Sequence, residues 1–469
     1  MKLINYIINF IGVNSFNKIS IIILLIAICE ITSTTTTNSN AQDSKTKSYS
    51  SYPDGFKGWV DPDTEDKVKI VKSYETGIDY HLVMSDEFNR DGRSFHDGAD
   101  PMWTSMDKND EDRGSGTMAL EFYNSTNVWT ENGNLVIRTE SKKTTWVGIN
   151  PYQSTATTPK VETMTRNFRS GMLQSWNKFC FTGGIFEINV KLPGTSSNGG
   201  LWPAVWLLGN LGRATFEASN NLMWPWSYPV CDRKKQEAQV ISGCDITTHY
   251  DLNPRQGRGA TEIDIIEIMA GEPGPLPVVT DMQRPYVSMT LQTAPGIPAK
   301  DNRPYPMTLP EWGFNWYQNL SYGGNTTINP FFYGTDLAST SPSDPVYRSK
   351  AQAYQADAIS SLSGLNDSFW TDFHTWRLEW QPGDEGYVKW YIDGEFKFGI
   401  LQESLNLMNS KIPQEPSSII INTAMSTSWG FPQPPAGCTE YDCSSSNGQC
   451  GFFPGIHYYP PQSYPLFTN

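Results

Sequence analysis

The chain has 469 residues, which is enough for one large domain or for two to three of ordinary size. Its formal net charge of −14 opposes contact with the phosphates of nucleic acids, so a nucleic-acid partner is excluded. Only 18% of the residues are charged, 13% are aromatic, and Gly and Pro number 38 and 32. This composition favours a β-rich, loop-rich globule over a helical bundle or a disordered chain.

The amino-terminal segment, residues 1–41, is expected to direct the chain into the secretory pathway. Residues 19–29 form an apolar run that ends at Glu30, and a helix that spans a bilayer needs about 20 apolar residues. The run is typical of a signal peptide, with an expected cleavage site at Ser39-Asn40-Ala41. Apolar residues scattered over 4–13 leave open an uncleaved anchor, which would make a type II membrane protein of the endomembranes instead of a secreted protein. Sequons that permit N-glycosylation stand at Asn124, Asn319, Asn325 and Asn366.

Cysteine usage agrees with an oxidising compartment. Apart from Cys29 in the apolar run, the cysteines are Cys180, Cys231, Cys244, Cys438, Cys443 and Cys450. Their even number indicates disulfides, and nearness in the chain favours Cys231–Cys244 and one pair within 438–450. A metal site is the alternative, but the C-x4-C-x6-C spacing matches no common zinc pattern.

Residues 42–77 are polar and weakly patterned, and we interpret them as a linker or an arm. The following part of the chain offers short runs rich in Ile, Val, Phe, Trp and Tyr between Gly, Pro, Asn or Asp, a pattern typical of strands. The predicted strands are 80–84, 135–139, 184–192, 202–208, 262–269, 287–292, 375–380, 387–392 and 419–424. Asp393-Gly394 predicts a hairpin turn, and only residues 351–365 hint at a short helix.

These elements predict an all-β fold, most simply two packed antiparallel sheets. Residues 78–436 exceed the roughly 250 residues of a usual one-domain sandwich. The stretches 210–260 and 292–365 are full of Pro, Gly, Asn and Ser, so we interpret them as insertions into one sandwich. Residues 437–469 form a tail rich in Cys and Pro.

The stretch GRGATEIDIIEIMAG, residues 257–271, concentrates the chemistry. It places Glu262, Asp264 and Glu267 among four isoleucines, although burying charge in a central strand is costly. Because strand side chains alternate, Glu262 and Asp264 share a face. Glu267 joins them only if a β-bulge at Ile265–Ile266 adds one residue, and this is what we predict. All three carboxylates then point into one cleft while the isoleucines pack behind them.

The spacing also predicts the type of reaction. With the bulge, Glu262 and Glu267 lie about 13 Å apart along the backbone, and inward-leaning side chains bring the carboxyls to about 5 Å, as in retaining glycosidases. Like charges at this separation keep one Glu protonated as the acid while the other is the nucleophile, which Asp264 orients. A solvated edge strand and a run of calcium ligands are the alternatives, and the isoleucines argue against full solvation.

EIDIIE resembles the catalytic signature of glycoside hydrolase family 16 in its bulged form. More of the chain resembles the β-glucan synthesis-associated, Kre/Skn-type subgroup. The matching stretches are LVMSDEFNRDGRSF, SGMLQSWNKFCFTGGIFEI, GLWPAVWLLGNLGR, WPWSYPVCD, GRGATEIDIIE, FHTWRLEWQPG and INTAMSTSWGF. The resemblance implies a concanavalin-like β-jelly-roll sandwich. It also implies that Glu262 is the nucleophile, Glu267 the acid/base and Asp264 the assisting carboxylate.

Aromatic residues are the candidate sugar contacts. Trp202 and Trp206 are four residues apart and share a strand face, so a core pair is the alternative, and the resemblance favours Trp206 as a stacking platform. Further candidates in matched motifs are Trp176, His374, Trp429 and, more weakly, Asn422. A lone histidine such as His374 is more often structural than a ligand contact.

Two functions remain open. One is a retaining glycosidase or transglycosylase that acts on β-1,3/1,6-glucan in the synthesis or remodelling of storage or wall glucan, and the complete carboxylate triad favours it. The other is a non-catalytic β-glucan-binding or assembly protein that uses the same cleft. No cofactor is required, and although some family-16 relatives hold a structural calcium, the sequence assigns no ligands for one. Members of this type usually end in a strand resembling DYVRVYQ; residues 454–469 contain four prolines instead, so we expect that strand to be missing or replaced.

Overall fold

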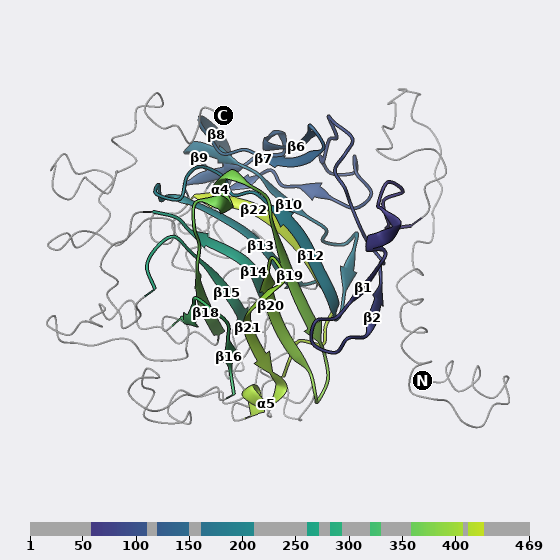
Figure 1. The fold of residues 1–469 in the computed structure, drawn as a ribbon. Coiled ribbons are helices and arrows are strands. Elements are labelled where there is room, and N and C mark those ends of the chain that lie inside the picture. Colours follow the sequence, from purple (N-terminus) through teal and green to yellow (C-terminus); the bar gives the residue numbers. More distant parts are fainter. Residues whose placement is uncertain are drawn as a thin grey trace, which may run out of the picture. The chain divides into compact units, whose positions relative to one another are not determined.

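The computed structural model describes residues 58–109, 120–149, 161–210, 260–271, 282–292, 319–329, 358–406 and 411–425 (Figure 1). Several expectations fall outside these residues. They are the secretory segment, most of both predicted insertions, the carboxyl-terminal tail, Trp429 and every cysteine except Cys180. No helix within the described ranges is long and apolar enough to cross a membrane.

The larger sheet of the described chain has nine strands, paired antiparallel in the order β17-β18-β15-β14-β13-β22-β10-β3, with β11 also paired to β22. Their bounds are β3 (Thr104–Ser105), β10 (Met172–Gln174), β11 (Cys180–Phe181), β13 (Leu201–Gly209), β14 (Glu262–Met269), β15 (Tyr286–Gln292), β17 (Thr326–Ile328), β18 (Ala358–Gly364) and β22 (Ser417–Met425). The strand that carries the three carboxylates, β14, lies between β13 and β15, inside the sheet.

The second sheet has five strands in the order β12-β19-β20-β21-β16, again antiparallel. Their bounds are β12 (Gly184–Val190), β16 (Ser321–Tyr322), β19 (His374–Gln381), β20 (Tyr387–Ile392) and β21 (Glu395–Leu401). The predicted hairpin between β20 and β21 is confirmed. Its turn residues Asp393 and Gly394 have φ angles of 50° and 80°, and positive φ at both central positions defines the turn type that suits a two-residue hairpin.

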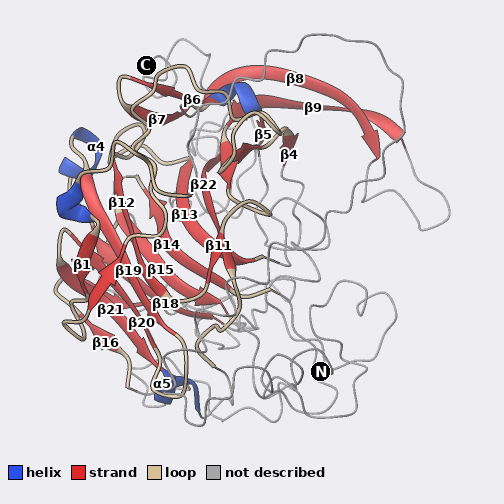
Figure 2. Ribbon diagram, turned by 90° about the vertical axis from the view of Figure 1, so that its right-hand side faces the viewer, coloured by secondary structure: helices blue, strands red, loops and turns tan. Residues whose placement is uncertain are grey.

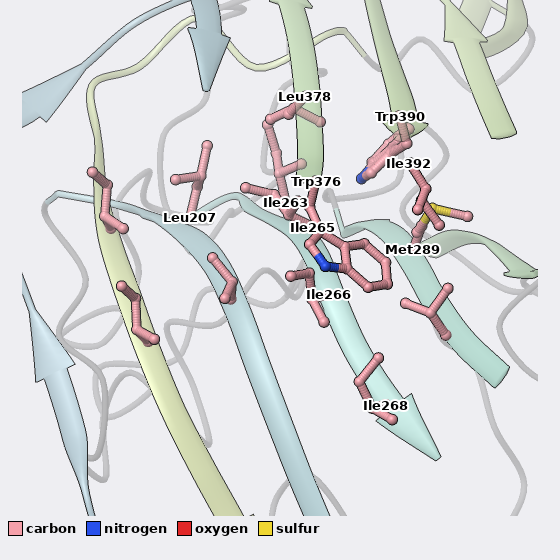
Figure 3. Close-up of a cluster of buried hydrophobic side chains, with 14 of the residues drawn as sticks. Leu207, Ile263, Ile265, Ile266, Ile268, Met289, Trp376, Leu378, Trp390 and Ile392 are labelled. Atoms are coloured by element: carbon pink, nitrogen blue, oxygen red, sulfur yellow. The ribbon is translucent and has the colours of Figure 1, made fainter. Parts of the chain in front are cut away.

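One hydrophobic core joins the two sheets, which form the two curved layers seen in Figure 2. Isoleucines of β14 pack toward Trp376 and Trp390 of the five-stranded sheet (Figure 3). The indole of Trp390 also donates a 3.0 Å hydrogen bond to the carbonyl oxygen of Asp264. Large aromatic side chains fill the space between the two sheets efficiently. The two packed antiparallel sheets confirm the predicted all-β jelly-roll sandwich.

Shorter elements surround the sandwich. The remaining strands are β1 (Ile70–Lys72), β2 (Asp79–His81), β4 (Lys108–Asn109), β5 (Glu121–Tyr123), β6 (Val128–Glu131), β7 (Asn134–Ile137), β8 (Glu140–Ile149) and β9 (Val161–Ser170). They form a β1-β2 pair, a β6-β7 pair and a β4-β5-β9-β8 sheet in which β5 and β9 are parallel. Short helices are η2 (Asp66–Val68), η3 (Ser125–Asn127), α4 (Ser368–Thr371) and α5 (Gln402–Leu405).

The β1–β2 hairpin crosses the expected boundary between arm and sandwich at residue 77. Its connecting turn contacts the outer face of the five-stranded sheet, because Ser73 Oγ and the Tyr74 backbone N–H donate to the Glu379 carboxylate at 2.6 and 2.7 Å. Arg377 lies beside Glu379 at 2.8 Å and under the Tyr74 ring at 3.9 Å. Residues of the polar stretch before residue 78 therefore belong to the folded unit.

The helix expected over 351–365 is wrong for residues 358–364, which form strand β18. This strand pairs with β15 on one side and β17 on the other. Its serines are buried, and they hide the alternation of apolar side chains that normally reveals a strand. Hydrogen bonds offset the burial: Ser360 Oγ, for example, pairs with Thr290 Oγ1 at 2.7 Å.

Candidate active site

Strand β14 brings the three acidic side chains to one face. They lie opposite three alternating residues of β15, in the pairs Glu262–Gln292, Asp264–Thr290 and Glu267–Ser288. Because alternating residues of a strand share a face, the carboxylates share one too. The register to β13 shifts between Val205, opposite Ile266, and Trp206, opposite Asp264, which leaves Ile265 as the extra residue. The predicted bulge is therefore confirmed.

The isoleucines of β14 explain why this strand tolerates three acids. Ile263, Ile265, Ile266 and Ile268 all belong to the core between the sheets and are at most 1% exposed. They pack β14 against the five-stranded sheet, and because strand side chains alternate, the acids on the opposite face of β14 point away from that sheet. The bulge thus gives the strand an apolar face for stability and a face with three carboxylates for chemistry.

The three carboxylates are buried, with exposed fractions of 3% for Glu262, 1% for Asp264 and 8% for Glu267. Burial raises the pKa of Asp264 to about 6, against the hydrogen bonds that Asp264 makes with Glu262 and Gln292. Burial also raises the pKa of Glu267 well above its usual value, and the charge of Asp264 raises it further, while a hydrogen bond with Trp202 lowers it. Burial therefore favours the protonated form of both acids, and at Glu267 the neighbouring charge of Asp264 adds to this effect.

Gln292, which ends β15, bridges two of the acids. Its Nε2 donates to Glu262 Oε1 at 2.9 Å and to Asp264 Oδ2 at 3.0 Å. The sequence analysis missed this residue, although it placed Gln292 correctly at the end of a strand. Which residue of a neighbouring strand lies opposite an acid depends on the register, and a single sequence does not reveal the register.

Trp206 and Trp202 of β13, two of the candidate sugar contacts, lie beside the acids. Trp206 is paired with Asp264 in the sheet, and Trp202 lies close enough to Glu267 to lower the pKa of that carboxyl. The Trp206 indole donates to Asn422 Oδ1 at 2.8 Å, and Asn422 Nδ2 donates to the Tyr123 hydroxyl at 3.2 Å. The bond to Asn422 holds the Trp206 ring in one orientation next to the acids. Trp206 is only partly buried.

Two other predicted contacts have different surroundings. Trp176 follows β10 and donates its indole N–H to the carbonyl oxygen of Asn210 at 2.9 Å. His374 lies at the start of β19 in the other sheet, where Nδ1 pairs with Asp393 at 2.6 Å and Nε2 with Ser368 at 3.0 Å. The structure thus groups Trp202, Trp206 and Asn422 with the acids and gives His374 protein partners on both ring nitrogens.

A row of neutral polar groups continues the acidic face across β15 and β18. Ser288, Thr290 and Ser360 are joined by hydroxyl hydrogen bonds of 2.7 to 3.2 Å, and Asn329 Nδ2 donates to Ser360 Oγ at 3.2 Å.

Within the described ranges, no group of three or more His, Cys, Asp or Glu side chains is arranged to hold a metal ion. The three carboxylates of β14 can perform proton transfer and nucleophilic attack.

Comparison with protein families gives one match. The family described as "Beta-glucan synthesis-associated protein SKN1/KRE6/Sbg1" matches residues 3–297 and 342–435. The Saccharomyces cerevisiae proteins KRE6 and SKN1, both described as beta-glucan synthesis-associated, are each 31% identical over 396 residues. Those alignments cover 79% of this chain but 46% and 43% of the relatives, so the chain spans about half the length of the curated relatives that it matches.

Solved structures of glucanases resemble the chain more distantly. The catalytic domain of a laminarinase, an endo-1,3-beta-glucanase from Thermotoga petrophila, is 20% identical with a TM-score of 0.41, over 75% of this chain and 90% of that one. The endo-beta-1,3-glucanase of Pyrococcus furiosus is also 20% identical, with a TM-score of 0.42 over 79% and 92% of the two chains.

Proposed function

The chain belongs to the SKN1/KRE6/Sbg1 family of beta-glucan synthesis-associated proteins, and on that premise we propose that it is a retaining glycosidase or transglycosylase acting on the O-glycosyl bonds of a β-1,3/1,6-glucan. One observation carries this proposal. A bulged central strand presents two glutamates and an aspartate on one buried face, where burial and the charge of Asp264 both raise the pKa of Glu267. A protein that only binds glucan needs no carboxyl with a raised pKa beside two further acids.

The proposed reaction has two steps. Glu267 donates its proton to the oxygen of the bond that breaks, while Glu262 attacks the anomeric carbon and forms a glycosyl ester. The Glu267 carboxylate then takes a proton from the incoming hydroxyl, which attacks the ester and releases Glu262. Water as the incoming group gives hydrolysis, and a sugar hydroxyl gives transglycosylation. Asp264, hydrogen bonded to Glu262, orients the nucleophile.

The substrate is proposed from the surroundings of the acids. Trp206 is half-buried beside Asp264 and fixed by Asn422, so its exposed part suits stacking on a glucose ring. We also propose, from the apolar run 19–29 alone, that the chain reaches its glucan in the secretory pathway or anchored to endomembranes.

Incubation of the chain with laminarin-derived β-1,3-gluco-oligosaccharides, followed by mass analysis of the products, tests the proposal. Shorter products indicate a hydrolase and longer products a transglycosylase, and Glu262→Gln should give neither. If the wild type binds the oligosaccharides but forms no product at any pH, the proposed activity is wrong and the chain is a glucan-binding protein.

A further inference from the structure

The amide of Gln292 is the one side chain of β15 that reaches two of the acids at once. Its two N–H bonds are directed to Glu262 Oε1 and Asp264 Oδ2, at 2.9 and 3.0 Å. The orientation of the amide follows from chemistry, because the opposite orientation would bring its oxygen against carboxylate oxygens that also accept. Gln292 is half-buried, and the ladder holds it opposite Glu262.

The two hydrogen bonds of Gln292 influence which of the buried carboxyls is ionised. Three buried carboxyls on one strand cannot all carry a charge. The residues that flank them in the register are uncharged on both sides: Gln292, Thr290 and Ser288 on β15, and Leu208, Trp206 and Ala204 on β13. Where the charge resides therefore depends on hydrogen-bond donors, which favour the ionised form of the group that they contact.

The donors are unevenly distributed. Gln292 serves Glu262 and Asp264, at one end of the triad, with two N–H bonds. At the other end, Glu267 lies beside the Trp202 indole and next to the charge of Asp264, which disfavours the ionised form of Glu267. The two hydrogen bonds of Gln292 consequently favour the negative charge at the nucleophile's end of the triad, and the proton at the end of Glu267.

We propose that Gln292 is a positioning residue that holds Glu262 ionised and in line with Asp264, and thereby determines which end of the triad is nucleophile and which is acid. This inference rests on the proposed function and deepens it, since it adds a residue that acts through the Glu262 carboxylate.

Two variants and a control test it through the pH profile of kcat/KM on β-1,3-gluco-oligosaccharides. Gln292→Met keeps the length of the side chain but has no donor. We expect the acidic limb of its profile to move up by about one pH unit, which is the shift that the loss of one charge-assisted hydrogen bond causes. At pH values below the limb, kcat should fall about tenfold. KM should change little. Gln292→Glu should move the limb further, because it adds a fourth carboxyl.

The control is Gln381→Met, the same substitution at an exposed residue of the five-stranded sheet, and its profile should match the wild type. An unchanged acidic limb in Gln292→Met, or a change confined to KM, would overturn the inference, because a residue that only packs or binds sugar leaves the titration of Glu262 unaltered.

A second measurement separates failure of this inference from failure of the proposed function. If the wild type turns over no glucan, the free energies of unfolding of the wild type and of Gln292→Met are compared across about pH 4 to 8. The hydrogen bonds favour the anions, so the advantage of the wild type should be small at acidic pH and should grow as the pH rises through about 6, near the pKa of Asp264. A difference that stays constant with pH would show that Gln292 merely packs, and the inference would be wrong.

Discussion

The indole N–H of Trp206 donates to Asn422 Oδ1 at 2.8 Å, across the pairing of β13 with β22. This bond fixes the aromatic ring closest in register to Asp264. Asn422 is itself 6% exposed and donates to the hydroxyl of Tyr123. The orientation of the Trp206 ring therefore depends on a buried chain of hydrogen bonds from Trp206 through Asn422 to Tyr123.

Replacing Asn422 should therefore affect substrate binding more than chemistry. In Asn422→Ala the indole N–H loses its acceptor, and we expect KM for β-1,3-gluco-oligosaccharides to rise about tenfold while kcat stays within a factor of about three. Tyr123→Phe removes only the second bond and should give a smaller rise in KM. Steady-state kinetics on both variants checks this. A fall in kcat with an unchanged KM would mean that the ring acts on the transition state and does not position the substrate.

Glu267→Gln should separate acid catalysis from nucleophilic attack. The amide cannot donate a proton to a poor leaving group, so we expect turnover of glucan to fall by about a hundredfold or more, whereas activated aryl glycosides should remain substrates. Glu403→Gln, the same change at an exposed residue of α5, is the control and should behave as the wild type. Equal losses on both kinds of substrate would contradict the assignment of Glu267 as the acid.

The raised pKa of Glu267 also predicts how stability depends on pH. The folded chain binds the Glu267 proton more tightly than the unfolded chain, whose pKa is near 4.5. Stability is therefore fully present below pH 4.5 and declines as the pH rises toward the folded pKa, by up to about 1.4 kcal/mol for each pH unit. Glu267→Gln removes this decline, so its midpoint of thermal unfolding should exceed that of the wild type at pH 7 but not at pH 4. Calorimetry at the two pH values tests it, and an equal shift at both would exclude the titration of Glu267 as the cause.

The turn of the β1–β2 hairpin should depend on Glu379. This carboxylate is 2% exposed and accepts from Ser73, Tyr74 and Arg377. In Glu379→Gln the charge that balances buried Arg377 is lost, and we expect a loss of about 3 kcal/mol in the free energy of unfolding. Proteolysis within residues 70–81 should also become faster. Glu395→Gln, the same change at a largely exposed carboxylate that pairs with Lys397, should alter neither the free energy of unfolding nor the rate of proteolysis. Proteolysis unchanged in Glu379→Gln would show that other contacts hold the hairpin.

Much of the sandwich could be predicted from the sequence because its central strands are apolar and end at clear turn residues. Strands β14 and β20 have the bounds that the pattern predicts, and Asp393-Gly394 forms the predicted turn. The long strands β8 and β9 were missed because they are rich in Thr, Lys and Arg and carry little apolar alternation. Strand β18 was misread for a related reason, since hydroxyl groups occupy its buried positions.

The site could be predicted as far as a single strand specifies it. The bulge follows from the requirement that three acids avoid the core, and its position at Ile265 agrees with that argument. Gln292 and Asn422 act across strands, and their roles depend on the pairing of β14 with β15 and of β13 with β22. Long-range register is decided by the whole sheet, so contacts of this kind emerge only from the structure.

In the proposed reaction, Glu262 forms a covalent bond with the substrate. A β-1,3-gluco-oligosaccharide activated as a 2-deoxy-2-fluoro glycosyl fluoride tests it most directly, because its leaving group needs no acid and the fluorine slows release of the ester. After incubation and digestion, mass spectrometry should find one glycosyl group on the peptide that contains Glu262, and none in Glu262→Gln. A label on Glu267, or turnover of the reagent with no label on any peptide, would contradict the account.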